Sequence, residues 1–365
     1  MKILYLVTSS GVGGVSTHIS QLSRHFKDKG WEIAVMSRPG GWLEEDVKKI
    51  GIKFYPNSYF SNFPNPFAWL KAKKEIEKVV SNFEPDLISC HSTVAGFLTR
   101  IAVKNKILTI FTAHGWGFTM GVPFFRKIPV ILVEKYISRF CSKIICVSDY
   151  DKNIALKYKI ASLEKLTVVH NGVEIKEPQI LNLKPQEEKI RMVFVGRLAK
   201  QKDPLLFLEA ISELEQGLKE KLEVSIVGEG PKRKKLENFI KKNNLKIKLL
   251  GELKRERVFE VLKQNHVFVL ISKWEGFPRT ILEAMTCGLA IIASDVGGTR
   301  EAVDKSCGIL VERGDKEGVK NAIQCLLENP QKIENMAKNA QNRVREKFSL
   351  EKMFKETEKV YLSIK

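Results

Sequence analysis

Short apolar runs alternate with amphipathic segments through the first half of the chain. The apolar runs that we assign to strands lie at residues 2–7, 32–37, 87–90, 107–112, 143–147 and 166–170. Segments with a helical spacing of apolar residues lie between them, at residues 15–27, 43–49, 94–103, 130–140 and 151–158. Strands that alternate with helices in this way form β-α-β units and a parallel sheet. The first half is therefore predicted to be a doubly wound α/β domain.

The alternation stops after Val173 and restarts at Ile190. Residues 174–189 contain two prolines and mixed charge without periodicity, which is typical of a linker. The second half repeats the scheme, with strands expected at residues 190–195, 224–227, 247–250, 267–271, 290–294 and 308–311. A chain of 365 residues also exceeds the usual size of one hydrophobic core. We expect a domain at residues 1–175, a second at 188–349, and a last helix at 350–365 that packs back across the domain junction.

The net charge is the unusual feature of the composition. A formal charge of +19 predicts a positive potential that attracts polyanions or an anionic membrane face. The lysines are dispersed among helices and the sequence has no signature of a nucleic-acid-binding module, so we expect no nucleic acid partner. The hydrophobic fraction of 44% is ordinary for a folded protein. The charge therefore indicates either a solvated basic face or attraction to an anionic membrane surface.

Hydropathy and cysteine spacing narrow the expected location. The stretch 122–145 is interrupted by six charged residues, too many for a membrane-spanning helix. The first apolar run is shorter than the core of a signal peptide. The six cysteines lack Cys-x-x-Cys spacing, so we expect reduced thiols with neither a disulfide nor zinc. We predict a cytoplasmic protein with peripheral attachment at the inner face of the cell membrane.

A glycine-rich turn at residues 11–14 follows the first expected strand and opens the first helix. Gly13 and Gly14 let the backbone approach a ligand, and amides at a helix N-terminus face an anion such as phosphate. A dinucleotide fingerprint would need a third glycine where Ser16 stands and an acidic residue at positions 37–38, which are Ser and Arg. NAD is therefore disfavoured. The alternative is that these glycines only make the turn.

Two further loops follow expected strands and carry polar residues. His114, beside Gly115, can exchange hydrogen bonds with a sugar hydroxyl or meet a developing charge, although a loop histidine can also be satisfied by the backbone. Arg197 and Lys202 bracket the loop after strand 190–195 and can reach a diphosphate from two directions. In a lysine-rich chain, cations in a loop can also occur by chance.

The segment 275–283, with the sequence Glu-Gly-Phe-Pro-Arg-Thr-Ile-Leu-Glu, is the most specific motif. Glu275 is expected on the loop after strand 267–271, and Glu283 one turn inside the following helix. Both carboxylates can then face one ligand at different depths. Carboxylates accept hydrogen bonds from ribose or sugar hydroxyls, and the helix N-terminus supplies amides for phosphate. The apolar context of Glu283 disfavours a merely solvated charge, because an unpaired buried charge is costly.

Two segments imitate functional motifs. Asp149 and Asp151 have the Asp-x-Asp spacing of metal-dependent sugar transferases, but they lead a helical pattern, which favours capping and compensation of the helix dipole. Residues 124–145 are apolar with basic insertions and could form a helix that lies on a membrane. A core helix with a solvated face is the interpretation that we favour for this segment.

Together the motifs resemble those of the family-4 retaining glycosyltransferases, over nearly the whole chain. The motifs that occur in the family's order are Gly13-Gly14 with His18, His114-Gly115, Asn171-Gly172-Val173, Gly196-Arg197 with Lys202, and residues 228–231, 275–283 and 297–301. The resemblance implies the GT-B fold, with two Rossmann-like, doubly wound parallel-sheet domains facing across a cleft. The N-terminal domain would then be the acceptor side, and the C-terminal domain would bind the nucleotide sugar.

The resemblance also implies which residues bind the donor. Gly13 and Gly14 would touch it. Arg197 and Lys202 would hold its diphosphate, and Glu283 would hold its ribose. Fixed cations and helix-end amides can stabilise the negative charge of a departing nucleoside diphosphate without a metal, and no other cofactor is expected.

The remaining implied residues surround the base and the transferred sugar. The base would lie near Leu253, and the amides of Gly276 and Phe277 would contact the sugar or a phosphate. The catalytic residues would be His114, near the anomeric carbon, and Glu275, at the transferred sugar. The sequence has no evident covalent nucleophile. The resemblance implies retention of anomeric configuration by front-face attack, in which the leaving phosphate helps to deprotonate the acceptor.

The expected activity is the transfer of a sugar from a nucleotide diphosphate sugar, a UDP-sugar, to an acceptor. The loop at residues 114–118 resembles that of members that build bacterial surface polysaccharides on polyprenyl diphosphate carriers. This resemblance implies a lipid-linked or growing glycan as the acceptor. The alternatives are a sugar-nucleotide 2-epimerase of similar fold, which would need a carboxylate set in the first domain, and a non-catalytic protein that binds nucleotide sugars.

Overall fold

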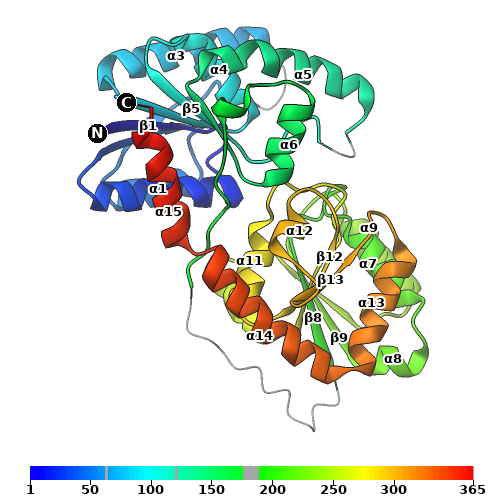
Figure 1. Cartoon of the computed structure of the whole chain (residues 1–365). Coiled ribbons are helices and arrows are strands. Elements are labelled where there is room, and N and C mark those ends of the chain that lie inside the picture. Colours follow the sequence, from blue (N-terminus) through cyan, green and yellow to red (C-terminus); the bar gives the residue numbers. More distant parts are fainter. Residues whose placement is uncertain (62–64, 120–121, 176–188, 365) are drawn as a thin grey trace. The chain divides into compact units, whose positions relative to one another are not determined.

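The computed structural model describes residues 1–61, 65–119, 122–175 and 189–364. The predicted linker at 174–189 lies mostly outside these residues. The chain divides into two compact units, which are shown in Figure 1. Unit 1 comprises Met1–Asn171 and Met353–Lys365, and unit 2 comprises Gly172–Lys352. None of the helices in the described ranges is both long enough and apolar enough to cross a membrane.

Unit 1 is built on a parallel sheet. Its described strands are β1 (Lys2–Leu6), β2 (Glu32–Ser37), β3 (Lys53–Pro56), β4 (Leu87–His91), β5 (Leu108–Ala113), β6 (Lys143–Cys146) and β7 (Leu166–Val168). They lie in the order β3-β2-β1-β4-β5-β6-β7, and each adjacent pair is parallel. The central strands β1, β2, β4 and β5 are buried along nearly their whole length, as expected for a sheet covered by helices on each side.

Helices cover both faces of this sheet. Those of unit 1 are α1 (Gly14–Asp28), α2 (Trp42–Lys49), α3 (Pro66–Phe83), α4 (Thr93–Val103), α5 (Phe124–Ile137) and α6 (Asp149–Lys157), with short 3-10 turns η1 (Ser138–Phe140) and η2 (Leu163–Lys165). Helices α3, α4 and α5 lie side by side in one layer (Figure 1). The last helix, α15 (Leu350–Leu362), packs on α1, where the rings of His25 and Phe354 stack with centroids 4.1 Å apart.

Unit 2 repeats the architecture. Its described strands are β8 (Ile190–Val195), β9 (Leu222–Val227), β10 (Ile247–Gly251), β11 (Val267–Leu270), β12 (Ala290–Ser294) and β13 (Gly308–Val311), in the order β10-β9-β8-β11-β12-β13. Its helices are α7 (Pro204–Ser212), α8 (Gln216–Glu220), α9 (Arg233–Lys242), α10 (Arg255–Lys263), α11 (Arg279–Thr286), α12 (Thr299–Ala302), α13 (Lys316–Glu328) and α14 (Pro330–Lys347).

The largest differences between the structure and the sequence-based expectation concern three elements. Strand β3 and helix α3 were not predicted. Strand β3 is a short edge strand, whereas α3 buries Ala72, Ile76, Val79 and Phe83 on one face, a helical spacing that was available in the sequence. Helix α5 begins at Phe124, six residues before the predicted start, although it contains Pro129. We expected a core helix whose exposed side is polar. This expectation is wrong, because the exposed residues of α5 include Phe125, Leu132 and Tyr136.

Both sheets have a topological switch point, at which the strand order reverses direction along the sheet. In unit 1 it lies between β1 and β4, and in unit 2 between β8 and β11. Loops that leave the carboxyl ends of two such strands run to opposite faces of the sheet and open a crevice between them. The predicted functional loops therefore have to be sought at these two places.

Candidate functional site

The switch point of unit 2 brings Lys202 and Glu275 into contact. Lys202 lies on the loop after β8 and Glu275 on the loop after β11. The Lys202 Nζ donates to Glu275 Oε1 across 2.6 Å. The side chain of Glu275 is 8% exposed and that of Lys202 is 17% exposed. A charged pair that is this sheltered from solvent is a stronger electrostatic element than a surface ion pair.

Further contacts join the same two loops. The Lys273 ammonium lies 2.8 Å from Asp203 Oδ2, and the Lys273 backbone N–H donates to the Gln201 carbonyl across 2.7 Å. The Gln201 side-chain amide donates to the Trp274 carbonyl across 3.0 Å. The Lys202–Glu275 pair is therefore held on both sides by contacts that fix its backbone.

The loop after β12 packs against the backbone of Glu275 and Gly276. The Gly298 N–H donates to the Gly276 carbonyl across 2.7 Å. Gly297 has a φ of +56°, and a Cβ there would lie 1.9 Å from the Glu275 carbonyl oxygen. Any side chain at position 297 would both strain the backbone and displace the Glu275 loop. The glycine motif at residues 297–301 thus positions the predicted catalytic carboxylate.

The Arg197 loop is supported in the same way by the loop after β9. The Leu198 N–H donates to the Glu229 carbonyl across 2.9 Å. Gly228 has a φ of +131°, and a Cβ there would lie 2.0 Å from the Gly196 carbonyl oxygen. Arg197 itself is exposed beside this tightly packed backbone, while Leu253, after β10, is partly buried.

Helix α11 places Glu283 among two arginines that sequence reasoning missed. Glu283 Oε1 lies 3.5 Å from Arg255 Nη2. Arg279, one turn before Glu283, is buried, and burial lowers the pKa of its guanidinium to about 10 against the opposite pull of the Glu283 carboxylate. The i,i+4 spacing of Arg279 and Glu283 within the motif was the available signal. Phe277 is buried against Phe348, with ring centroids 5.2 Å apart.

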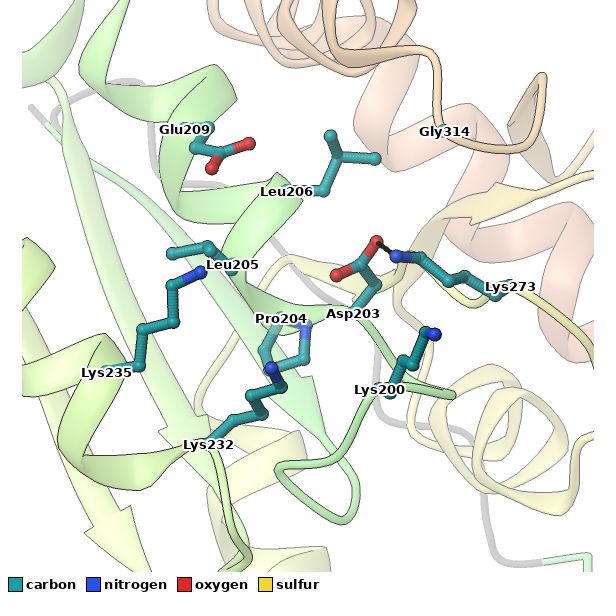
Figure 2. Close-up of a pocket in the computed structure, with 10 residues that line it drawn as sticks. All are labelled: Lys200, Asp203, Pro204, Leu205, Leu206, Glu209, Lys232, Lys235, Lys273 and Gly314. Atoms are coloured by element: carbon teal, nitrogen blue, oxygen red, sulfur yellow. Dashed lines mark ion pairs between the residues drawn. The ribbon is translucent and has the colours of Figure 1, made fainter.

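A pocket of about 480 Å³ adjoins the Lys200–Asp203 loop of unit 2 (Figure 2). It is lined by Lys200, Asp203, Pro204, Leu205, Leu206, Glu209, Lys232, Lys235, Lys273 and Gly314. Four of these residues are lysines, although Lys273 is paired with Asp203. None of the predicted site residues lines it. The pocket is a basic neighbour of the loop rather than the predicted site.

The switch point of unit 1 joins the loops after β1 and β4. The Thr8 and Ser92 hydroxyls are 2.7 Å apart, and the Ala95 N–H donates to Thr8 Oγ1 across 3.1 Å. The predicted glycine turn follows at the start of α1. Gly13 has an extended φ of 169°, and a Cβ there would meet nothing within 4 Å. Packing does not demand a glycine at this position, and the space beside it is open to a ligand.

Three histidines converge beside this switch point. His18 lies on α1, His91 at the end of β4 and His114 directly after β5. The ring centroids of His18 and His114 are 4.9 Å apart, and those of His91 and His114 are 5.3 Å apart. Their nitrogens lie within 4.8 Å of one another, so the cluster has the composition of a metal site. The predicted absence of a metal stays a prediction.

A buried hydrogen-bond chain leads to His114. Tyr361 donates to Ser89 Oγ across 3.0 Å, and burial raises the pKa of this tyrosine to about 12, so it keeps its proton. Ser89 Oγ lies 3.1 Å from His91 Nε2, and His91 Nδ1 lies 2.9 Å from His114 Nε2. With the Ser89 hydroxyl donating to His91, the network assigns the His91 proton to Nδ1 and makes His114 Nε2 an acceptor. The remaining proton of a neutral His114 then sits on Nδ1.

His91 makes the stability of unit 1 depend on pH. Burial lowers the pKa of His91 well below its usual value, and the neighbouring His114 lowers it further. Below about pH 6.5 the unfolded chain binds a proton at His91 that the folded chain does not, so stability falls as the pH falls. We expect a loss of about 1.4 kcal/mol per pH unit, and a shallower slope for His91→Gln. Urea unfolding at pH 7.5 and 5.5 measures both slopes, and equal slopes would contradict the assignment.

The Asp-x-Asp sequence lies at the start of α6. The helix is capped by Ser148, whose side chain accepts from the Asp151 N–H across 3.1 Å. Asp149 and Asp151 occupy the first turn, and Asp151 is buried with Oδ2 2.9 Å from Ser148 Oγ. The capping and dipole interpretation agrees with this geometry, although the capping side chain is that of Ser148.

Two family models match the chain. The model described as Glycosyltransferase Family 4 matches residues 12–177, and the model described as Glycosyl transferases group 1 matches residues 176–343. Together these matches extend over most of both units.

Curated relatives match most of the chain. A UDP-Gal:alpha-D-GlcNAc-diphosphoundecaprenol alpha-1,3-galactosyltransferase of Escherichia coli is 31% identical over 81% of this chain and 80% of the relative. The O-antigen biosynthesis glycosyltransferase WbnH of Escherichia coli is 30% identical over 86% of each chain. Among solved structures, HepE of Anabaena in complex with UDP-glucose superposes with a TM-score of 0.83 at 20% identity over the whole of both chains.

Proposed function

Because the chain belongs to glycosyltransferase family 4, we propose that it transfers a sugar from a UDP-sugar to a lipid-linked or growing glycan of cell-surface polysaccharide synthesis. The family and the GT-B fold, both expected from the motifs, are confirmed. The relatives named above are transferases, which favours transfer over the epimerase and over the binding scaffold.

The contact between Lys202 and Glu275 is the observation that carries the proposal. It joins a cation and a carboxylate at the switch point of a parallel sheet, where such folds bind their ligands. We assign Lys202, with Arg197, to the donor diphosphate. Charge that develops on the departing diphosphate would be met by fixed cations that need no reorganisation at the moment of reaction.

Glu275 has two roles in the proposed reaction, one toward Lys202 and one toward the transferred sugar. Its carboxylate aims the Lys202 ammonium, and its remaining lone pairs accept hydrogen bonds from the transferred sugar. Glu283 holds the ribose, and Arg255, 3.5 Å from its Oε1, together with the buried Arg279 orients its carboxylate. The backbone amides of residues 276–277 bind the sugar or a phosphate.

His114 is the second catalytic residue in this proposal. The chain through Ser89 and His91 makes its Nε2 an acceptor, so its Nδ1–H is the atom that can donate to the donor sugar. The glycine turn at Gly13 and Gly14 approaches the donor, and a Cβ at Gly13 would meet nothing within 4 Å. Leu253 marks the place of the base.

We also propose that the reaction retains the anomeric configuration and needs no metal. The cations and helix-end amides assigned above suffice for the leaving group, and the departing phosphate can take the proton of the acceptor hydroxyl in a front-face attack. The proposed reaction uses no cofactor. The proposed acceptor and donor follow the named activity of the galactosyltransferase relative, which uses UDP-Gal and a diphosphoundecaprenol-linked sugar.

We expect UDP release to require both a UDP-sugar and a polyprenyl-diphosphate-linked acceptor, and to survive the addition of EDTA. A thermal-shift screen of nucleotide sugars comes first, since a donor at about 100 times its Kd stabilises the folded chain by about 2.7 kcal/mol. The anomeric configuration of the product is then read by NMR.

Each outcome of this experiment separates the alternatives. UDP release that is independent of acceptor points to an epimerase, and donor binding without any release points to a scaffold. Loss of activity in EDTA that returns with a divalent metal contradicts metal independence. An inverted product contradicts the front-face mechanism.

A further inference from the structure

Helix α5 is apolar on the side that faces solvent. Its exposed large residues are Phe124, Phe125, Ile128, Leu132, Val133 and Tyr136. Phe125 is 71% exposed and Leu132 is 60% exposed. Residues 125, 128, 132 and 136 are spaced by three or four, so they form one continuous stripe along the helix.

The opposite face of α5 carries its only acidic residue into the protein interior. Glu134 is buried, and its Oε2 accepts from Arg100 Nη2 across 2.9 Å. A surface helix of a soluble domain has the reverse arrangement, with apolar residues inside and charges outside. The packing of unit 1 therefore does not account for the apolar stripe, which is turned away from the core. A stripe of this size marks a surface for an apolar partner.

The surroundings of the stripe are basic. The sequence has no Asp or Glu between Asp86 and Glu134. Lys104, Lys106, Lys135 and Arg139 are exposed. Asn105 Nδ2 donates to the Arg139 carbonyl across 3.2 Å, which brings the 104–106 loop beside the end of α5. The Arg139 guanidinium lies 4.6 Å from the centroid of the Tyr136 ring.

We propose that α5 lies on an anionic bilayer, with the stripe from Phe125 to Tyr136 inserted at the boundary of headgroups and acyl chains. Aromatic and aliphatic side chains on one face of a helix, bordered by lysine and arginine, bind such a surface through burial and attraction together. The formal charge of +19 adds to the attraction. The proposal extends the lipid-linked acceptor of the proposed function, on which it rests for its purpose but not for its geometry.

The position of α5 links the bilayer to the candidate catalytic histidine. The loop that begins at His114 packs against α5, because a Cβ at Gly117 would lie 3.4 Å from Val130 Cγ1. Docking of α5 holds this loop close to the membrane surface. An acceptor anchored in the bilayer by a polyprenyl chain would then reach the loop without leaving the membrane.

The test is sedimentation with vesicles of phosphatidylcholine alone and of phosphatidylcholine with phosphatidylglycerol. We expect the native chain to bind the anionic vesicles, and to lose most of that binding in about 1 M salt, where the Debye length falls to about 3 Å. The variant Phe125→Glu/Leu132→Glu is expected to bind at least about tenfold more weakly. Leu362→Glu, at a leucine of α15 that is 47% exposed, is the matched control and is expected to bind as the native chain does.

Folding and catalysis are measured separately on each variant. Thermal unfolding and UDP release with a short-chain, detergent-free acceptor analogue are expected to stay near native values, since the substituted residues are exposed. If the double variant unfolds early, the single Leu132→Asn is used in its place. Vesicle binding of the native chain in the absence of UDP release supports the docking surface and overturns only the proposed function.

Three results would overturn the docking surface. The first is no binding of the native chain to anionic vesicles at low salt. The second is unchanged binding of the α5 variant, which would place the membrane contact elsewhere. The third is a native dimer in analytical ultracentrifugation that the α5 variant abolishes while vesicle binding persists, since the stripe would then be an interface between two copies.

Discussion

Alanine at Lys202 or at Glu275 is expected to lower kcat by at least about two orders of magnitude while the unfolding temperature stays near the native value. Removal of one preorganised group that stabilises developing charge costs about 10²–10³ in rate. The two side chains contact each other at 2.6 Å, so each loss also misplaces or unpairs the other. The double variant should therefore be little worse than the single variants, because residues that act as a unit are not additive.

Steady-state kinetics of UDP release measures this prediction, with Lys316→Ala as the control. Lys316 is paired with Glu213 on the surface of unit 2, and both side chains are 41% exposed. Its loss is expected to leave kcat unchanged. A kcat within about threefold of the native value in Lys202→Ala or Glu275→Ala would contradict the catalytic role assigned to that residue.

Replacing Glu134 by alanine is expected to destabilise unit 1 by about 3–5 kcal/mol. The side chains of Arg100 and Glu134 are 0% and 2% exposed, so the change leaves a buried guanidinium without its carboxylate. Arg100 also donates from Nε to the Gly96 carbonyl across 2.9 Å and lies 4.1 Å from the centroid of the Phe111 ring, which holds it in place. The stranded charge therefore cannot swing out to water at low cost.

Denaturant unfolding followed by tryptophan fluorescence measures this loss, since four of the five tryptophans, at positions 31, 42, 69 and 116, belong to unit 1. Glu77→Ala, which breaks the exposed pair with Lys73, is the control and is expected to cost less than about 1 kcal/mol. The double change Arg100→Met/Glu134→Leu should recover most of the stability, because it removes both charges. A cost below about 1 kcal/mol for Glu134→Ala would contradict the burial of the pair.

Much of the fold could be predicted because most of its strands are runs of apolar residues. The bounds of β2, β8, β12 and β13 agree with the sequence-based expectation, since in buried parallel strands nearly every position is apolar and the run ends where the strand ends. Strand β3 lacks this signal because it has only four residues, begins with Lys53 and ends with Pro56, and contains no buried residue.

The loops that carry the candidate site residues could be predicted from the sequence, but the contacts between those residues could not. Post-strand position is a property of the sequence pattern, so Lys202 and Glu275 could be assigned to loops at the carboxyl ends of strands. Their pairing depends on which strands become neighbours, and β8 and β11 lie next to each other although two other strands separate them in sequence. His91 was not predicted for the same reason. Its partner His114 follows β5, and only the strand order shows that β4 and β5 are neighbours.

The sequence by itself determined the class of this protein, its two parallel-sheet units and the loops that carry its chemistry, because these follow from local periodicity and from short motifs. Only the tertiary structure decided that Arg279 and Arg255 lie near Glu283. It also decided that a hydrogen-bond chain from Tyr361 leads through Ser89 and His91 to His114. The outward orientation of the apolar stripe of α5 likewise came from the structure alone. The apolar residues of α5 occur around much of its circumference, so periodicity could not say which side faces the core. The buried Arg100–Glu134 pair settled the orientation, since one acidic side chain needed a partner that only the folded chain supplies.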